Sequence, residues 1–307
     1  MTSALTLRFN AQMQLDLQRI TRELGDLQRQ LASGAKANDL MGYGSGVAQL
    51  INARGLLAQT DARATAAAQL GARFDLQASA LSRAAQGGTD LAKAMHDAVA
   101  TNSASSLGVN LNLAFSMITS AFNEQWNGQP LFAGERVGDG PVTINSLDQL
   151  ATAIIPSGVF AEADRHQILE LESGAKITLA EKASEIGRDL YEAMRDIKQL
   201  IDSHGGALPD PMPEAVRDQV QALASRVENA SRVVTAAEGR SGQTQRRITD
   251  EREHLTARSN LLTKEIGDRA DADVPAIALK LSQLEAQYQA TAKVFGDLSR
   301  LSLLEYL

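Results

Sequence analysis

The sequence contains no cysteine, and aromatic residues make up only 4% of its 307 residues. The absence of cysteine excludes disulfides, thiolate metal ligands and a cysteine nucleophile. Proline is scarce, with seven in the chain and none before Pro130. Because proline interrupts helices, the long proline-free stretch at the N-terminus can form long helices with an aliphatic core. A compact enzyme built around aromatic residues is therefore the less favoured hypothesis.

Charge of one sign is not concentrated in any segment. The net charge is −7, and acidic and basic residues are interspersed, which argues against a nucleic-acid-binding surface. No uninterrupted apolar run approaches the roughly 18–20 residues of a membrane span. The N-terminus lacks the basic and apolar regions of a cleaved signal peptide. We expect a chain that stays in the cytoplasm or leaves the cell without a cleaved signal.

Both ends of the sequence carry a narrow apolar seam at the alternating spacing of three and four residues that coiled coils use. Isolated helices of this kind are marginal in water, so they become ordered on neighbours. We expect the seams to pack between subunits, because terminal arms would lack an intramolecular cover; packing within one chain is the alternative. The seam residues are Met13, Leu17, Ile20, Leu24, Leu27 and Leu31 near the N-terminus and Ile277, Leu281, Leu284, Tyr288, Phe295, Leu298, Leu301 and Leu304 near the C-terminus.

The middle of the chain differs from its ends. A long helix is predicted over about 47–100, with Gln77 and Gly88 interrupting its apolar stripe. Further along, glycine, proline and aspartate become frequent, and the apolar period switches to two at Val142 and Ile144. The segments around Leu169 and Ile177 predict a β-hairpin with its turn at 172–175. A helix over about 180–203, a loop over 204–213 and a final return to helix are expected.

The predicted fold is mainly α: a long antiparallel helical bundle or coiled coil formed by the N- and C-terminal segments, with a small β-containing insert in mid-chain. The expected domains are an N-terminal coiled-coil arm (1–40), the N-terminal half of a helical shell domain (41–128), a β-containing outer insert (129–180), the C-terminal half of the shell domain (181–271) and a C-terminal coiled-coil arm (272–307).

Glycine and proline mark the breaks between these regions. Gly34 suits a left-handed helix C-cap, and Pro275 fits either the first turn of a new helix or a kink in a continuous one. Gly42, Gly44 and Gly46 have the spacing of a phosphate-binding loop, but no strand precedes them and no Lys-Ser/Thr follows. We interpret these five positions as hinges.

No arrangement of residues predicts catalysis, so we expect no enzyme, no cofactor and no metal site. The histidines are scattered and form no H-E-x-x-H pattern. Asp268, Asp271 and Asp273 lack the full EF-hand pattern, so a solvated break is favoured over calcium binding.

Two regions of the sequence resemble the flagellin family. Residues 27–38 resemble its N-terminal LxxLSSGxRI-like motif, which follows a heptad helix, and the stretch 266–304 resembles the matching C-terminal motif. The segment 127–135, Asn-Gly-Gln-Pro-Leu-Phe-Ala-Gly-Glu, is similar to the N-G-x-x-L-F-A/S-G segment of the hook-associated protein 3 branch, the hook–filament junction proteins. The ending 301–307 is similar to that branch's terminus. The sequence departs from the family after Asn38, where an Asp-Pro-Ala-type step is expected.

The resemblance implies a structural subunit of the bacterial flagellum. Its terminal helices would form an inner tube, the next helices a shell, and the insert the outer surface. A ring of identical subunits would join the hook, through hook-associated protein 1, to the flagellin filament and transmit torque. Export would use the flagellar type III apparatus without a cleaved signal, with a chaperone holding the C-terminal helix beforehand. A flagellin-type filament subunit is the alternative, and a soluble coiled-coil sensor or binding module is a more remote one.

Overall fold

The computed structural model describes residues 2–37, 39, 41–155, 157–170, 176–179 and 181–304. Side chains are described for the residues of these ranges that lie between 11 and 297, with the exception of residue 170. The α-helices are α1 (Thr2–Ser33), α2 (Val47–Thr101), α3 (Leu107–Phe122), α4 (Leu147–Thr152), α5 (Ala183–Ser203), α6 (Glu214–Ala270) and α7 (Val274–Leu304). A 3₁₀ helix, η1, covers Met41–Gly46, and the strands are β1 (Gln125–Trp126), β2 (Gln129–Pro130), β3 (Ile168–Glu170) and β4 (Lys176–Thr178). The predicted mainly α fold with a small β-containing insert is confirmed.

Tertiary contacts divide the chain into two compact units. The terminal unit contains Met1–Ala64 together with His254–Leu307, and the central unit contains Thr65–Glu253. Each unit therefore includes a part of α2 and a part of α6. The five-part division expected from the sequence remains a prediction.

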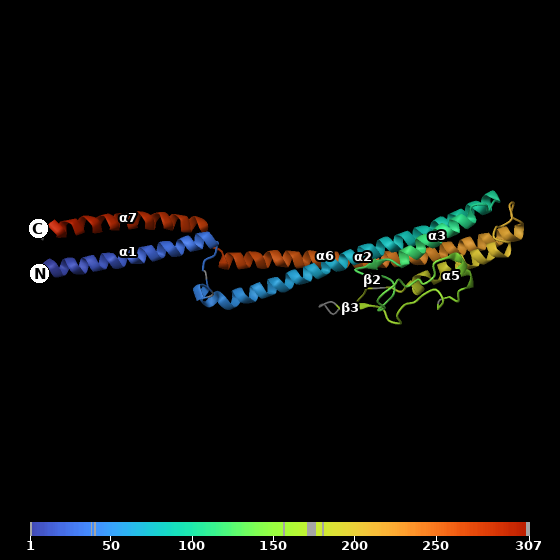
Figure 1. Ribbon diagram of the computed structural model, residues 1–307, viewed down its shortest axis with the longest axis horizontal. Helices are drawn as coiled ribbons and strands as arrows, with labels where there is room; N and C mark the ends of the chain where they lie inside the picture. The colour runs from blue at the N-terminus through green and yellow to red at the C-terminus, as the bar shows by residue number, and fades with distance from the viewer. Residues whose placement is uncertain are drawn as a thin grey trace. The chain divides into compact units, whose positions relative to one another are not determined.

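In the terminal unit, α1 and α7 lie side by side and run in opposite directions (Figure 1). An ion pair of 3.0 Å between Lys280 Nζ and Glu23 Oε1 joins them. A second antiparallel pair is formed by the start of α2 and the end of α6, where Ser259 Oγ donates to Asp61 Oδ1 at 2.6 Å. Leu50 and Leu262 are buried in this part of the unit. Both pairs follow from apolar stripes with helical spacing.

The central unit has a broad core drawn from α2, α3, α5, α6 and the insert. Tyr191 of α5 is fully buried, and its ring makes edge-to-face contacts with Phe115 of α3 and Phe160 of the insert. Its hydroxyl shares a hydrogen bond of 2.9 Å with Thr119 Oγ1. Burial raises the pKa of Tyr191, since the phenolate would be poorly solvated there.

Helix α2 approaches α6 closely where a side chain is missing. A Cβ added to Gly88 would lie 2.2 Å from Ser231 Oγ of α6, so any larger residue here would force the Ser231 side chain to move. Gly88 and Gln77, which interrupt the apolar stripe of the sequence, both lie at the packed interface; Gln77 is buried. The packed face of α2 therefore includes these two positions, although neither residue is apolar in the sequence pattern.

The insert begins with a tight hairpin. Strands β1 and β2 pair through Trp126 and Gln129, and the two residues between them, Asn127 and Gly128, both have positive φ. This is the conformation that a two-residue turn needs and that Asn-Gly favours. The next residues of the chain, Leu131, Phe132 and Ala133, are fully buried.

The predicted pairing of the segments around Leu169 and Ile177 is confirmed, since β3 and β4 pair antiparallel with these two residues opposite each other. The predicted turn at 172–175 lies outside the described residues. The hairpin packs on α2 and α6 through Ile177, against Phe74 and Ile248. At the period-two segment, Val142 forms a single bridge with Phe160 and otherwise pairs with the side-chain amide of Asn123.

Candidate functional site

The seams of α1 and α7 pack on each other. Ile20 and Leu27 of α1 form one buried cluster with Ile277 and Leu284 of α7. Leu24 and Leu281 pack against this cluster, and Met13 is also buried. The two helices therefore cover each other within one chain, and the expectation that the terminal arms lack an intramolecular cover is wrong. Whether the seams also pack between subunits remains a prediction.

Other predicted seam residues are less enclosed. Leu17 and Phe295 are half-buried, and Leu31 and Tyr288 are exposed. The side chains of Leu298, Leu301 and Leu304 lie outside the described residues. The seam thus continues beyond the buried cluster as partly open apolar surface.

A second apolar surface lies on α7 away from the seam. At 3.6 residues per turn, Leu279 and Val294 project about 200–260° around the helix from Ile277. Leu279 is 63% exposed and Val294 48%. The polar Gln283, also exposed, interrupts this face at about 240°, and its apolar residues are Leu279, Ala286, Ala290 and Val294, all of them exposed. We call these four residues the outer strip of α7. The strip was not among the predicted seam residues, although its helical spacing was a readable signal.

The breaks at Gly34 and at the start of α7 meet in one joint. Gly34 has φ +68°, and its carbonyl accepts a hydrogen bond of 2.8 Å from the amide of Ala272. The amide of Lys36 donates to Ala270 O at 2.8 Å, and its Nζ donates to Asp268 O at 2.7 Å. The end of α1 is therefore tied by main-chain hydrogen bonds to the α6–α7 connection.

Pro275 lies in the first turn of α7, which resolves the alternative of a kink in a continuous helix. Asp273 precedes the helix, and its carboxylate accepts a hydrogen bond of 3.0 Å from the amide of Ala276. This is a side-chain N-cap, and proline is tolerated at this end because its missing N–H would have no intrahelical partner.

The glycines of η1 have different roles. Gly44 has a positive φ of 55°, and a Cβ on Gly42 would lie 2.4 Å from Ala37 Cβ. A Cβ added to Gly46 would have no neighbouring atom within 4 Å. A turn therefore requires two of the three glycines, and hinge motion at any of them remains a prediction.

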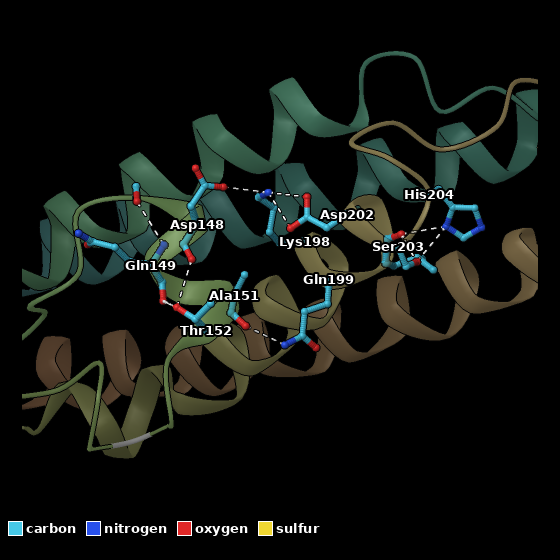
Figure 2. A network of polar contacts seen from close by, with 11 residues as sticks. Asp148, Gln149, Ala151, Thr152, Lys198, Gln199, Asp202, Ser203 and His204 are labelled. Carbon is cyan, nitrogen blue, oxygen red and sulfur yellow. Dashed lines mark hydrogen bonds and ion pairs between the residues drawn. The ribbon is translucent and has the colours of Figure 1, made fainter.

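The insert is fastened to α5 by a polar network (Figure 2). Lys198 Nζ lies 2.9 Å from Asp148 Oδ1 of α4 and 2.6 Å from Asp202 Oδ1, one helical turn further along α5. Hydrogen bonds to Asp202 and then to Asp148 raise the pKa of Lys198. Gln199 Nε2 donates to Ala151 O at 2.8 Å. These contacts hold α4 on α5.

The Ser203–His204 pair at the end of α5 is a helix cap (Figure 2). His204 Nδ1 lies 2.9 Å from Leu200 O and 3.1 Å from Ser203 Oγ. Because the carbonyl can only accept, Nδ1 carries the proton and cannot act as a base toward the serine. Within the described ranges, no group of three or more His, Cys, Asp or Glu residues could hold a metal ion. No helix of the described part of the chain is long and apolar enough to cross a membrane.

No protein-family profile matches the sequence, and no curated protein matches it. Solved structures do match. A protein described as flagellar hook-associated from Vibrio parahaemolyticus superimposes with a TM-score of 0.58 at 16% identity, over 76% of this chain and 99% of that one. FlgL from Bacillus cereus superimposes with a TM-score of 0.42 at 10% identity, over 62% and 96%. At these identities, the first match establishes that this chain has the fold of the Vibrio flagellar hook-associated protein.

Proposed function

We propose that this chain is a non-enzymatic structural subunit of the bacterial flagellum, of the hook–filament junction type. It joins the hook, through hook-associated protein 1, to the flagellin filament and transmits torque between them. Three observations support the proposal: the fold shared with the Vibrio hook-associated protein, the flagellin-like motifs at both ends of the sequence, and the pairing of α1 with α7.

The outer strip of α7 is the observation that carries the assembly role. Leu279 and Val294 are exposed although the seam of the same helix is buried in α1. Exposed apolar side chains on the face opposite an occupied seam can contact another partner. We infer that this partner is an identical neighbouring subunit in a ring. The terminal helices then line an inner tube, and the insert faces outward.

The outer strip of α7 also fits the proposed export of the protein. An apolar strip on a terminal helix needs a cover before assembly, and a cytoplasmic chaperone on the C-terminal helix would supply it. Export through the flagellar type III apparatus would then deliver the subunit to the cell exterior. Gly34, Gly42, Gly44, Gly46 and Pro275 are proposed as hinges that adjust the arms in the ring.

Deletion of the gene tests the function. We expect cells with hooks but no filaments, and flagellin released into the medium, because filament subunits would have no junction on which to assemble. Electron microscopy and analysis of the medium provide the readout. Filaments that are merely shortened would favour the flagellin-type alternative.

A pair of variants tests the surface. Leu279→Asp places a charge on the outer strip, and we expect the purified monomer to fold normally but to fail to restore filaments in the deletion strain. Leu113→Asp on α3 is the matched control, because Leu113 is also 63% exposed, and it should restore them. Restoration by both variants would overturn the role of the strip. Full protease resistance of both ends in a dilute monomer would favour the coiled-coil sensor alternative.

A further inference from the structure

The sequence contains a single Asn-Gly pair, and the fold places it in the exposed turn of the β1–β2 hairpin. Asn127 and Gly128 are both exposed, with φ values of 50° and 75°. Within the part of the chain that the structure describes, the amide nitrogen of Gly128 donates no backbone hydrogen bond and the side chain of Asn127 has no hydrogen-bond partner. Both groups are therefore open to solvent and to each other.

An asparagine side chain can react with the amide nitrogen of the residue that follows it. The nitrogen attacks Cγ, so that an N–Cγ bond forms, the Cγ–Nδ2 bond breaks, and ammonia leaves with the amide proton. Water then opens the resulting five-membered succinimide. Cleavage at Cγ gives aspartate, and cleavage at the backbone carbonyl gives isoaspartate, in which the main chain runs through Cγ. Glycine favours the attack because it has no side chain beside the nitrogen, and the reaction is intramolecular.

Asn102, the other described asparagine with positive φ, shows a protected case. Its φ is 54°, but the nitrogen that would attack it, Ser103 N, donates a hydrogen bond of 3.1 Å to Ala98 O. Asn102 Oδ1 is buried, and Ser103 carries a side chain beside its nitrogen. The same sign of φ thus occurs once with an engaged nitrogen and once with an open one. The fold therefore distinguishes Asn127 from Asn102.

We propose that Asn127 is a modification site, at which the folded chain converts spontaneously to isoaspartate with water as the only co-reactant. Isoaspartate adds one backbone atom and one negative charge to a two-residue turn, so the pairing of Trp126 with Gln129 is not maintained. The strand after the turn leads directly into the core, where Leu131 N donates to Glu124 O at 3.0 Å. The conversion therefore loosens the start of the insert.

Ageing of the purified full chain at neutral and mildly alkaline pH tests the site. Peptide mass spectrometry and methylation by an isoaspartyl methyltransferase measure conversion at each asparagine. We expect isoaspartate at Asn127 to exceed that at Asn102 by about tenfold or more, because Ser103 N must first lose its hydrogen bond. Conversion should increase with pH, since the attacking nitrogen must lose its proton. Equal conversion at the two positions, or none at Asn127, would overturn the proposal.

The same measurement in urea separates the fold from the sequence. Unfolding should accelerate conversion at Asn102, where a hydrogen bond is lost, and should change the rate at Asn127 by less than about threefold. A rate at Asn127 that rises as strongly as the rate at Asn102 would show that the hairpin protects both positions, and the proposal would fail.

Two substitutions test the effect on the insert. Asn127→Gly tolerates the positive φ and has no side-chain amide to lose, whereas Asn127→Asp has the new charge without the extra backbone atom. In converted molecules, hydrogen exchange at the Leu131 amide should be about tenfold faster than in fresh protein. Aged Asn127→Gly and fresh Asn127→Asp should exchange like the fresh wild type. Exchange at Leu131 that ageing leaves unchanged, or that ageing accelerates equally in Asn127→Gly, would overturn the loosening of the insert.

Discussion

The arm pair and the central unit are both built from long helices, but they bury very different amounts of side chain. The buried cluster between α1 and α7 consists of Ile20, Leu27, Ile277 and Leu284. The central unit has a large continuous core with interlocking aromatic rings. Regions with few buried contacts open at lower free energy. We therefore expect the arms to be the less stable part of the chain.

The largest effect should come from the central core. Phe122→Ala removes a fully buried ring that packs edge-to-face on Phe132, and it should lower the free energy of unfolding by about 3–5 kcal/mol. Urea unfolding followed by circular dichroism measures this. Leu113→Ala, at an exposed position of the same helix, should change it by less than about 0.5 kcal/mol. A loss below about 1 kcal/mol for Phe122→Ala would contradict the description of this core.

The arms should respond locally. Ile20→Ala deletes a seam residue that is 1% exposed and should weaken the α1–α7 pair by about 2–3 kcal/mol. Limited proteolysis of the wild-type monomer should remove roughly the first and last 30 residues before the rest, and the variant should be cut there faster. Hydrogen exchange in α5 should stay unchanged. Slower exchange in the arms than in α5 would reverse the comparison.

The buried Tyr191 should make the stability of the central unit depend on pH. The pKa of Tyr191 is raised in the folded state, so the unfolded state loses its proton first as the pH rises. Stability should therefore be complete below about pH 10 and fall above it, by up to about 1.4 kcal/mol per pH unit. Denaturant unfolding between pH 8 and 11 gives the slope. Tyr191→Phe should remove this part of the slope, and Tyr288→Phe in the arm should retain it. An unchanged slope in Tyr191→Phe would assign the pH dependence to other groups.

The smallest effects come from one substitution made at two glycines of α2. Gly88→Ala should destabilise the chain by about 1 kcal/mol, because the added Cβ meets Ser231. Gly55→Ala has open space around it and should stabilise by about 0.5–1 kcal/mol through helix propensity. Urea titrations measure the change in the free energy of unfolding for each substitution. Changes of opposite sign would support the close crossing of α2 and α6, whereas stabilisation by both substitutions would argue against it. Ser231→Ala combined with Gly88→Ala should recover part of the loss.

Local signals of the sequence predicted most of the fold. The seam spacing and the glycine at position 34 mark the end of α1. The prolines at 209–213 mark the start of α6. The Asn127-Gly128 turn also has a local signal, the Asn-Gly pair that two-residue hairpin turns favour. Packing across α2, α6 and the insert depends on contacts between distant residues. For this reason, the burial of Arg73 could not be predicted, whereas the pairing of the two terminal helices was.

The tie between Gly34 and Ala272 has a mechanical consequence. Antiparallel main-chain hydrogen bonds at 34–36 and 270–272 join two chain segments at one level. A force applied to either terminal helix is then shared by the two hydrogen-bonded segments, 34–36 and 270–272, and neither segment must resist bending alone. We therefore expect the α1–α7 pair to bend at this joint as one body, because bending α1 alone would break both main-chain hydrogen bonds.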